Sequence, residues 1–295
     1  QRPVRMARGI CGAGCAFPPD RSGRVMQPRR PTFRTWRRLS YAAGAPVQGQ
    51  RALPEEVAVA LSYNGSTQAV MMATPADLTD FAYGFSLTEG IAHPAEIESI
   101  EVVETPHGLD VQIWLQPQAE ARLAKRRRTM AGPVGCGLCG IDSLEEATRK
   151  MAVVPASSFH MTATEVMAAV ASLPGAQPLH DATRAAHAAG FWSNGLIAAR
   201  EDVGRHNALD KLTGHLIRTP HRDGAVILTS RVSIDMVQKV AALGAPVLIA
   251  VSTPTAQATA LAESAGITLI ALARPSSFEV FTHTNRISKE TADVA

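Results

Sequence analysis

The sequence is poor in cysteine, in aromatic residues and in long apolar runs, and each shortage excludes a class of protein. Cys occurs 4 times in 295 residues and aromatic residues make up 5%, which excludes a small disulfide-stabilised scaffold. Apolar runs stay below the roughly 18 residues that a membrane-spanning helix needs. The chain also lacks G-x-G-x-x-G and G-x-x-x-x-G-K-[ST], two phosphate-binding fingerprints. A composition with 46% hydrophobic and 19% charged residues is that of an ordinary globular protein of one or two domains.

Negative charge is almost absent from the N-terminus. Residues 1–50 hold ten Arg and one acid, Asp20, whereas the rest of the chain holds 19 bases and 25 acids, so the formal net charge of +3 comes from the tail. Residues 1–40 show no helical or strand period and mix Arg with Gly, Pro and Ser, which predicts a disordered basic tail over residues 1–44. Because the body is acidic, we expect no nucleic-acid partner. Because no long apolar run is present and no apolar region follows the twin-arginine-like Arg29-Arg30, we expect no membrane association and a cytoplasmic location.

Residues 45–130 are predicted to form a small α+β domain. Asn64-Gly65 separates two alternating segments and is a strong signal for a hairpin turn. Thr74-Pro75-Ala76-Asp77 is typical of a helix start, with Thr74 as the N-cap, and Gly90 is expected to end that helix. The expected elements are strands at 55–63 and 68–73, a helix from 78, and a second hairpin at 100–104 and 109–115.

Residues 131–295 are predicted to form a parallel sheet covered by helices. Short apolar runs alternate there with helical segments, at 225–229, 232–243, 247–251, 255–265 and 268–273. Ligands of open α/β sheets bind beyond the carboxyl ends of the strands. Those ends read 229–231 (TSR), 252–254 (STP) and 273–275 (ARP), and hydroxyl groups, helix N-termini and Arg suit phosphate groups. The alternative is that Ser252 to Thr255 only cap a helix.

The sharpest chemical signal is the glycine-rich segment Gly135-Cys136-Gly137-Leu138-Cys139-Gly140, which is typical of a loop. A capping box at 143–146 predicts a helix directly after it, and the basic run 125–128 precedes it, so both favour the thiolate form. Three interpretations are open. The pair could be a thioredoxin-like redox centre, a structural zinc site completed by Cys11 and Cys15, or a persulfide carrier.

Two further motifs bear on the chemistry. A zinc-dependent deaminase needs H-x-E upstream of P-C-x-x-C, but here the C-x-x-C comes first and His187-Ala188-Ala189 has Ala in place of Glu, which argues against deamination. Residues 201–207 gather four ionisable side chains before a predicted helix. There Arg205 could hold a phosphate and His206 could move protons, or Asn207 caps the helix and the charges form a solvated turn.

Five blocks of the chain resemble the formate dehydrogenase accessory sulfurtransferase family, FdhD. They are 83–91 (YGFSLTEGI), 135–146 (GCGLCGIDSLEE), 201–212 (EDVGRHNALDKL), 229–240 (TSRVSIDMVQKV) and 251–274 (VSTPTAQATALAESAGITLIALAR). The resemblance covers roughly residues 53–287. It implies an α/β fold with a cytidine-deaminase-like three-layer C-terminal domain, a smaller α+β N-terminal domain, and a homodimer.

The resemblance also implies a function. Members of this family accept persulfide sulfur from a cysteine desulfurase and pass it to the molybdenum of the bis(molybdopterin guanine dinucleotide) cofactor, which formate dehydrogenase requires. Cys136 would carry the persulfide with Cys139 as its partner, and the cofactor would bind as cargo, with no permanently bound metal. The guanine nucleotide would lie on the segment Ala271, Leu272, Ala273, Arg274, Pro275 and Ser276.

An alternative of another class is a carrier or chaperone of the same cofactor that transfers no sulfur. This sequence also departs from the family pattern at two places. Arg184-Ala185 stands where a Gly pair is usual, and Pro275 stands where Gly or a polar residue is commoner.

Overall fold

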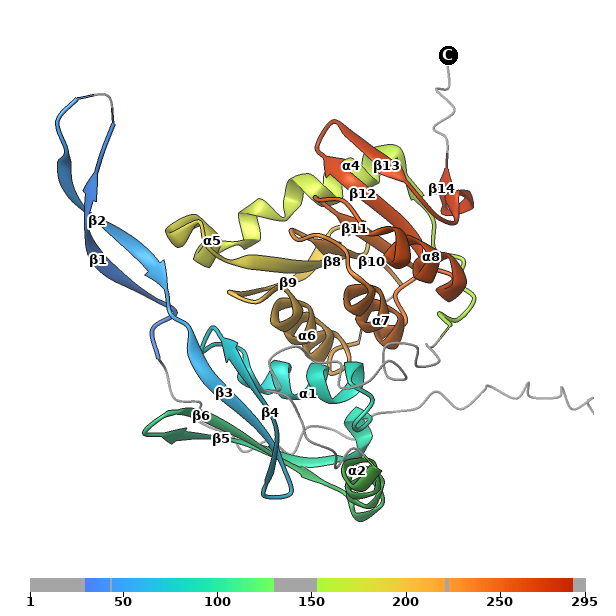
Figure 1. The fold of residues 1–295 in the computed structure, drawn as a ribbon. Helices are drawn as coiled ribbons and strands as arrows, with labels where there is room; N and C mark the ends of the chain where they lie inside the picture. Colours follow the sequence, from blue (N-terminus) through green and yellow to red (C-terminus); the bar gives the residue numbers. More distant parts are fainter. Residues whose placement is uncertain (1–29, 43, 130–152, 221–222, 289–295) are drawn as a thin grey trace, which may run out of the picture.

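The computed structural model describes residues 30–42, 44–129, 153–220 and 223–288. These residues form a mixed α/β structure with a four-stranded sheet, a six-stranded sheet and a projecting two-stranded arm (Figure 1). None of the described helices combines the length and the apolar character that crossing a membrane requires.

The four-stranded sheet lies within the predicted small domain. Its order is β4-β3-β6-β5, formed by β3 (Val57–Tyr63), β4 (Ser66–Ala73), β5 (Ile97–Thr105) and β6 (Gly108–Leu115), with β3 and β6 parallel. The predicted turn between β3 and β4 is confirmed, because Asn64 and Gly65 both have positive φ, at 48° and 78°. The second predicted hairpin is also confirmed, as β5 and β6 pair in antiparallel fashion.

Helix α1 (Leu78–Thr88) follows β4, but it begins differently from the prediction. Its N-cap is Asp77, in the left-handed region and without a side-chain cap hydrogen bond. The hydroxyl group of Thr74 instead accepts a hydrogen bond from the backbone N–H of Val203, at 3.1 Å. The prediction that Thr74 caps this helix is therefore wrong, since a tertiary contact takes its side chain.

The six-stranded sheet confirms the predicted parallel core. Its order is β13-β12-β11-β10-β8-β9, formed by β8 (His187–Trp192), β9 (Leu196–Asp202), β10 (Ala225–Leu228), β11 (Val247–Ala250), β12 (Thr268–Arg274) and β13 (Ser277–Val280). Strands β10, β11 and β12 are parallel neighbours, whereas β8 and β13 run antiparallel to the strands beside them. Short β7 (Met161–Thr162) and β14 (Ile287–Ser288) pair separately.

Helices cover both faces of this sheet. One face packs against α6 (Arg205–Leu216), α7 (Ile234–Leu243) and α8 (Ala256–Ala265), and the other packs against α4 (Ala163–Ser172) (Figure 1). The strand residues divide between the faces by alternation, because Val226 and Leu228 pack with the three helices and Ala225 and Ile227 with α4. The predicted helix ends are confirmed at Gly244 and Gly266, both left-handed. Short α5 (Pro178–Thr183) precedes β8.

Helices α1 and α6 join the two sheets. The apolar residues Phe81 and Phe85 of α1 pack in the core of the four-stranded sheet. On its other side α1 crosses α6 at Gly84 and Gly214, where the backbones approach so closely that a Cβ atom on Gly84 would lie 1.8 Å from the carbonyl oxygen of Asp210. This crossing holds the small sheet beside the large one.

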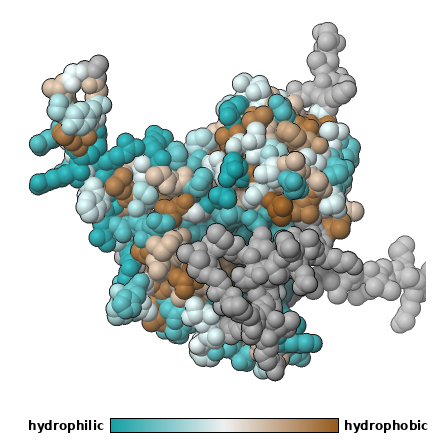
Figure 2. Space-filling model, viewed as in Figure 1, coloured by the Kyte–Doolittle hydropathy of each residue, from teal (hydrophilic) through white to brown (hydrophobic). Residues whose placement is uncertain are grey.

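The arm corrects the prediction of a disordered tail over residues 1–44 at residues 33–40, which form a strand, whereas residues 1–29 and 43 lie outside the described residues. Strand β1 (Phe33–Ser40) pairs in antiparallel register with β2 (Val47–Pro54), and the hairpin projects from the body (Figure 1). Its side chains are largely exposed on both faces, including Trp36 at 60% and Tyr41 at 75%, and hydrophilic surface predominates along it (Figure 2). With neither face buried, the strand has no apolar period, which is why its sequence resembles that of a disordered segment.

Candidate functional site

The carboxyl ends of β10, β11 and β12 meet at one edge of the six-stranded sheet, because the three strands are parallel neighbours. Strand β9 ends at the same edge and β8 begins there, since β8 runs antiparallel to both β9 and β10. The loops after β10 and β11 are tied together, as the backbone N–H of Thr255 donates to the carbonyl of Val232 at 3.0 Å. The edge predicted from the sequence therefore exists.

The segment 271–276 occupies the end of β12 at this edge. Ala271 and Ala273 are fully buried, whereas Arg274, Pro275 and Ser276 are exposed. Leu272 has a φ of 51° and the register with β13 shifts between Ala271 and Arg274. A non-glycine residue in the left-handed region costs roughly 1 kcal/mol or more, and such strain gathers at functional sites.

Arg274 and the loop after β11 are partly structural. The Nη1 of Arg274 donates to the carbonyls of Val251 at 2.5 Å and Ala273 at 2.9 Å. The hydroxyl of Thr255 accepts from the backbone N–H of Ala258 at 3.2 Å and caps α8. The capping alternative for this loop is thus confirmed at Thr255, while the predicted role of residues 271–276 in binding guanine stays a prediction.

The loop before α6 is not a solvated turn, because Asp202 is buried and paired and the other ionisable residues are half-buried. Asp202 is fully buried and accepts from the Nζ of Lys211 at 2.6 Å and from the backbone N–H of Thr74 at 3.0 Å. Asn207 does not cap α6, whose N-cap is Gly204; its amide donates to the carbonyl of Met72 at 2.9 Å and to Asp202 at 3.0 Å. This part of the loop fastens α6 to the end of β4, which corrects the capping alternative.

Two other residues of that loop keep unpaired polar atoms. The Nε of Arg205 and the Nε2 of His206 are buried and have no hydrogen-bond partner among the described residues. The Nε2 of His206 nevertheless lies 3.7 Å from Oδ2 of Asp235, within ion-pair distance, and His206 lowers the pKa of Asp235 below its usual value. Buried polar atoms without partners are rare in proteins and call for an explanation.

A cavity of about 380 Å³ opens at the same edge, between α5 and the ends of β8 and β10. It is lined by His180, Arg184, Ala185, Ala186, His187, Val203 and Thr229. Burial lowers the pKa of His187 below its usual 6.5, and the positive charges of Arg205, His180 and His206 lower it further. The pKa of His187 is thus held below its usual value, mainly by burial, and the one permanent cation that lines the cavity, Arg184, is paired with Asp181.

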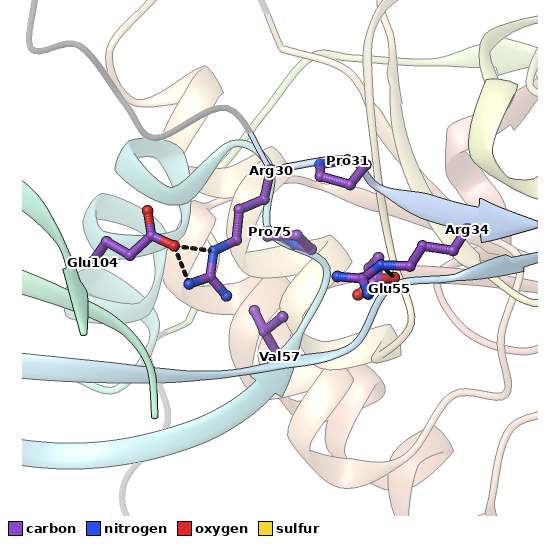
Figure 3. A pocket seen from close by; sticks show the side chains of 7 residues that line it. All are labelled: Arg30, Pro31, Arg34, Glu55, Val57, Pro75 and Glu104. Atoms are coloured by element: carbon purple, nitrogen blue, oxygen red, sulfur yellow. Dashed lines mark hydrogen bonds and ion pairs between the residues drawn. The ribbon is translucent and has the colours of Figure 1, made fainter. Parts of the chain in front are cut away.

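A second cavity of about 340 Å³ lies at the base of the arm (Figure 3). Its two cations are paired with acids, since the guanidinium of Arg30 donates to Glu104 and that of Arg34 forms an ion pair with Glu55 (Figure 3). Both cations of the arm cavity are therefore already paired.

The predicted thiols lie outside the described residues. Cys136 and Cys139, the capping box at 143–146 and the candidate zinc ligands Cys11 and Cys15 all fall there. Helix α2 (Pro117–Thr129) contains the basic run 125–128 that precedes the thiols. Within the described ranges, no three His, Cys, Asp or Glu side chains are arranged to hold a metal ion.

Sequence reasoning missed the charged clusters where α1 meets α6 and α7. The Nζ of Lys239 donates to Glu89 at 2.7 Å and to both carboxylate oxygens of Asp210 at 3.0 Å. Arg200 and Arg218 both bind Asp80, at 2.8 Å and 2.9 Å. The sequence signal for such a cluster is a charged residue within an otherwise apolar helical face, such as Lys239 in the 232–243 segment.

Known proteins resemble this chain in sequence and in fold. The model of the FdhD/NarQ family matches residues 54–288. The chain is 53% identical over 261 residues to the sulfur carrier protein FdhD of Agrobacterium fabrum, covering 87% of this chain and 96% of that protein. It is 54% identical over 245 residues to the protein of the same name from Brucella abortus, covering 81% and 91%.

A solved structure has the same fold. It is described as a formate dehydrogenase accessory protein from Desulfotalea psychrophila, and it superposes with a TM-score of 0.68 at 25% identity, covering 88% of this chain and all of that one. The match of the family model over most of the chain, together with relatives above 50% identity, identifies the family. The chain belongs to the FdhD/NarQ family.

Proposed function

We propose that this protein is a sulfur carrier that formate dehydrogenase needs for its activity, and that it works as a sulfurtransferase through a persulfide on Cys136. The observation that carries the proposal is the Gly-flanked C-x-x-C at 135–140 in a chain more than half identical to proteins named sulfur carriers. Among the three interpretations of the thiol pair, this one alone uses a reactive thiol as a carrier of sulfane sulfur.

Sulfur transfer takes two steps. In the first, the Cys136 thiolate attacks the terminal sulfur of a persulfide on a cysteine desulfurase, and the desulfurase thiolate leaves. In the second, the Cys139 thiolate attacks the inner sulfur, at Cys136, so that a Cys136–Cys139 disulfide forms and the terminal sulfur leaves as hydrosulfide. The two thiols are oxidised by two electrons and the transferred sulfur is reduced by two, which supplies a sulfido ligand to molybdenum.

The recipient in this proposal is the bis(molybdopterin guanine dinucleotide) cofactor, bound as cargo. Its guanine nucleotide is assigned to residues 271–276, and the exposed Arg274 and the strained Leu272 at the sheet edge support that assignment. The neighbouring strand order β9-β8-β10-β11-β12 supports a deaminase-like description of the large sheet. We further propose a cytoplasmic homodimer.

The test is mass spectrometry of the protein after incubation with a cysteine desulfurase and cysteine. An added mass of about 32 Da on the peptide that holds residues 136–139 is expected, and Cys136→Ala should abolish it. Cys139→Ala should keep the added sulfur but fail to release it, and Cys11→Ala should behave like the wild type. Full sulfur transfer by Cys136→Ala would refute the proposal.

The alternative is a cofactor carrier or chaperone that transfers no sulfur. It is favoured if the peptide gains no mass while the purified protein holds guanine nucleotide. A thioredoxin-like pair would instead form a reversible disulfide and gain no sulfur. A zinc site would show bound zinc on metal analysis.

A further inference from the structure

The β1–β2 arm holds half of the large apolar side chains that are exposed among the described residues. Twelve such side chains are exposed, and six of them lie on this hairpin, namely Phe33, Trp36, Leu39, Tyr41, Val47 and Leu53. Single exposed apolar residues are normal on a protein surface, but a cluster of them marks an interaction site. The family model begins at residue 54, so the fold that the family shares does not account for the cluster.

The arm also carries positive charge without acids to neutralise it. Residues 33–54 hold Arg34, Arg37, Arg38 and Arg51 and no acid. Arg34 forms an ion pair with Glu55 at the base of the arm. The other three arginines are exposed and form no ion pair with the residues that the structure describes. An apolar cluster among unpaired cations suits a partner that is itself acidic.

Trp36 lies in the middle of one face of the hairpin. Cross-strand pairing places Trp36 directly opposite Arg51, and Arg38 directly opposite Gly49, so these residues share a face. A Cβ atom on Gly49 would lie 3.8 Å from the guanidinium carbon of Arg38, so this side chain lies over the backbone of β2. The Trp36 ring contacts no other ring or cation among the described residues. We call the surface formed by Trp36, Arg38 and Arg51 the Trp36 face.

The hairpin also has two open edges. Strands β1 and β2 form a sheet of two strands, so the outer edge of each pairs with no other strand in the described part of the chain. Exposed sheet edges accept a further strand from a binding partner. An isolated hairpin of two strands is only marginally stable in water, and a third strand stabilises it.

We propose that the arm binds an acidic, extended segment of a partner protein, which adds as a third strand beside the Trp36 face. The backbone of that segment pairs with an open edge of the hairpin. An apolar side chain of the partner packs on Trp36, and carboxylates two residues before and after it accept hydrogen bonds from Arg38 and Arg51. Trp and Arg are among the residues that dominate binding energy at protein interfaces.

Three other occupants fit the arm less well. A second copy of the chain would bring its own arginine-rich arm to the edge, and like charges on adjacent strands repel. A nucleic acid binds through several stacking aromatic residues along a basic groove, whereas the Trp36 face holds one aromatic ring and residues 51–295 hold 19 bases against 25 acids. A lipid surface needs one continuous apolar face, but Phe33 and Leu39 share the opposite face with Arg37.

The experiment is fluorescence polarisation of the full-length protein with the labelled peptide Thr-Glu-Thr-Leu-Thr-Glu-Thr, in which Glu, Leu and Glu share one face of a strand. Saturable binding is expected, and added NaCl should weaken it because salt screens exposed charges. The same peptide with Lys in place of Glu should bind about tenfold more weakly or worse. Replacing the two Thr beside Leu by Pro removes backbone donors and should weaken binding by a similar factor.

Matched variants separate the two faces of the arm. Arg38→Glu and Trp36→Ala should each weaken binding of the acidic peptide about tenfold or more. Arg37→Glu is the control for charge, because Arg37 is an exposed neighbour on the opposite face, and Leu39→Ala is the control for apolar surface. Both controls should keep the Kd within about twofold of the wild type. Since these residues belong to none of the apolar cores, all four variants should keep the wild-type Tm.

Equal losses for Arg37→Glu and Arg38→Glu would overturn the proposal, because they would show a non-specific effect of charge. Absence of saturable binding would also overturn it, as would tighter binding of an oligothymidylate or of phosphatidylglycerol vesicles than of the peptide. Dissociation of a dimer by Trp36→Ala in sedimentation would assign the face to a second copy and contradict the proposal. None of these measurements depends on Cys136 or on a desulfurase, so failure here is distinguishable from failure of the sulfur-transfer proposal.

Discussion

Replacing Gly84 by Ala tests whether the crossing of α1 and α6 holds the two sheets together. A Cβ atom at position 84 would lie 1.8 Å from the carbonyl oxygen and 2.6 Å from the carbonyl carbon of Asp210, and 2.8 Å from the backbone nitrogen of Gly214. All three are backbone atoms, so no side-chain rotation relieves the clash. The environment of Gly214 is similar, because a Cβ atom added there would lie 1.8 Å from the carbonyl oxygen of Asp80.

The expected loss of stability is the difference between the cost of overpacking and the gain in helix propensity. Non-bonded contacts need about 3.5 Å, so the helices would have to separate by roughly 1.5 Å or more. Overpacking of this kind typically costs about 1–3 kcal/mol, and backbone atoms favour the upper end. Replacing Gly by Ala within a helix stabilises the helix by about 1 kcal/mol, which offsets part of this cost. We expect the free energy of unfolding to fall by about 2 kcal/mol, which lowers the Tm by about 4–8 °C.

The assay is thermal unfolding by circular dichroism, with Gly175→Ala as the control. Gly175 is exposed in the short 3₁₀ helix at Pro174–Ala176, and a Cβ there meets nothing within 4 Å. That variant should leave the Tm unchanged or slightly raised. Helix propensity alone predicts that Gly84→Ala stabilises the protein, so an unchanged or higher Tm for Gly84→Ala would refute the reasoning.

Two further predictions concern charged groups. Lys239→Met should lower the free energy of unfolding by about 3–5 kcal/mol, because it leaves Asp210 buried without its cation. Burial already raises the pKa of Asp210. The loss of stability measured by urea titration should therefore shrink as the pH falls and Asp210 is neutralised. Arg122→Met, which removes an exposed partner of Glu96, should cost less than about 1 kcal/mol, and equal losses for the two variants would contradict this. The hydrogen bond from Arg122, and then that from the backbone of His93, lower the pKa of Glu96 below 4.5. Its contribution to stability is therefore present above pH 4.5 and lost as pH falls through the lower folded value, so Glu96→Gln should cost up to about 1 kcal/mol at pH 7 and nothing in strong acid. An equal cost at both pH values would refute the assignment.

The sequence predicted the elements whose signals are local. The turn at Asn64-Gly65, the helix ends at Gly244 and Gly266 and the alternation of apolar strands with helices all depend on neighbouring residues, and the structure has them. The prediction failed at Thr74 and Asn207, whose side chains look like helix caps in the sequence. Both bind partners more than 120 residues away, and no local pattern reports such a partner.

The prediction for the β1–β2 arm failed for a different reason. A strand that buries neither face needs no apolar period, and its hydrogen bonds to β2 depend on a return of the chain that composition does not record. The Arg-rich composition of residues 30–40 is compatible with a disordered tail as well as with an exposed hairpin.

By itself the sequence determined the family, the thiol pair at 136 and 139 and the strand ends where a ligand is expected, because these are contained in short contiguous motifs. The tertiary structure alone decided which charged residues are structural and which are available. It buried Asp202 against Lys211 and left Arg274 exposed at the edge of the large sheet. The physical reason is that the free energy of a charge depends on its burial and on its partners, and packing brings those partners from distant parts of the chain.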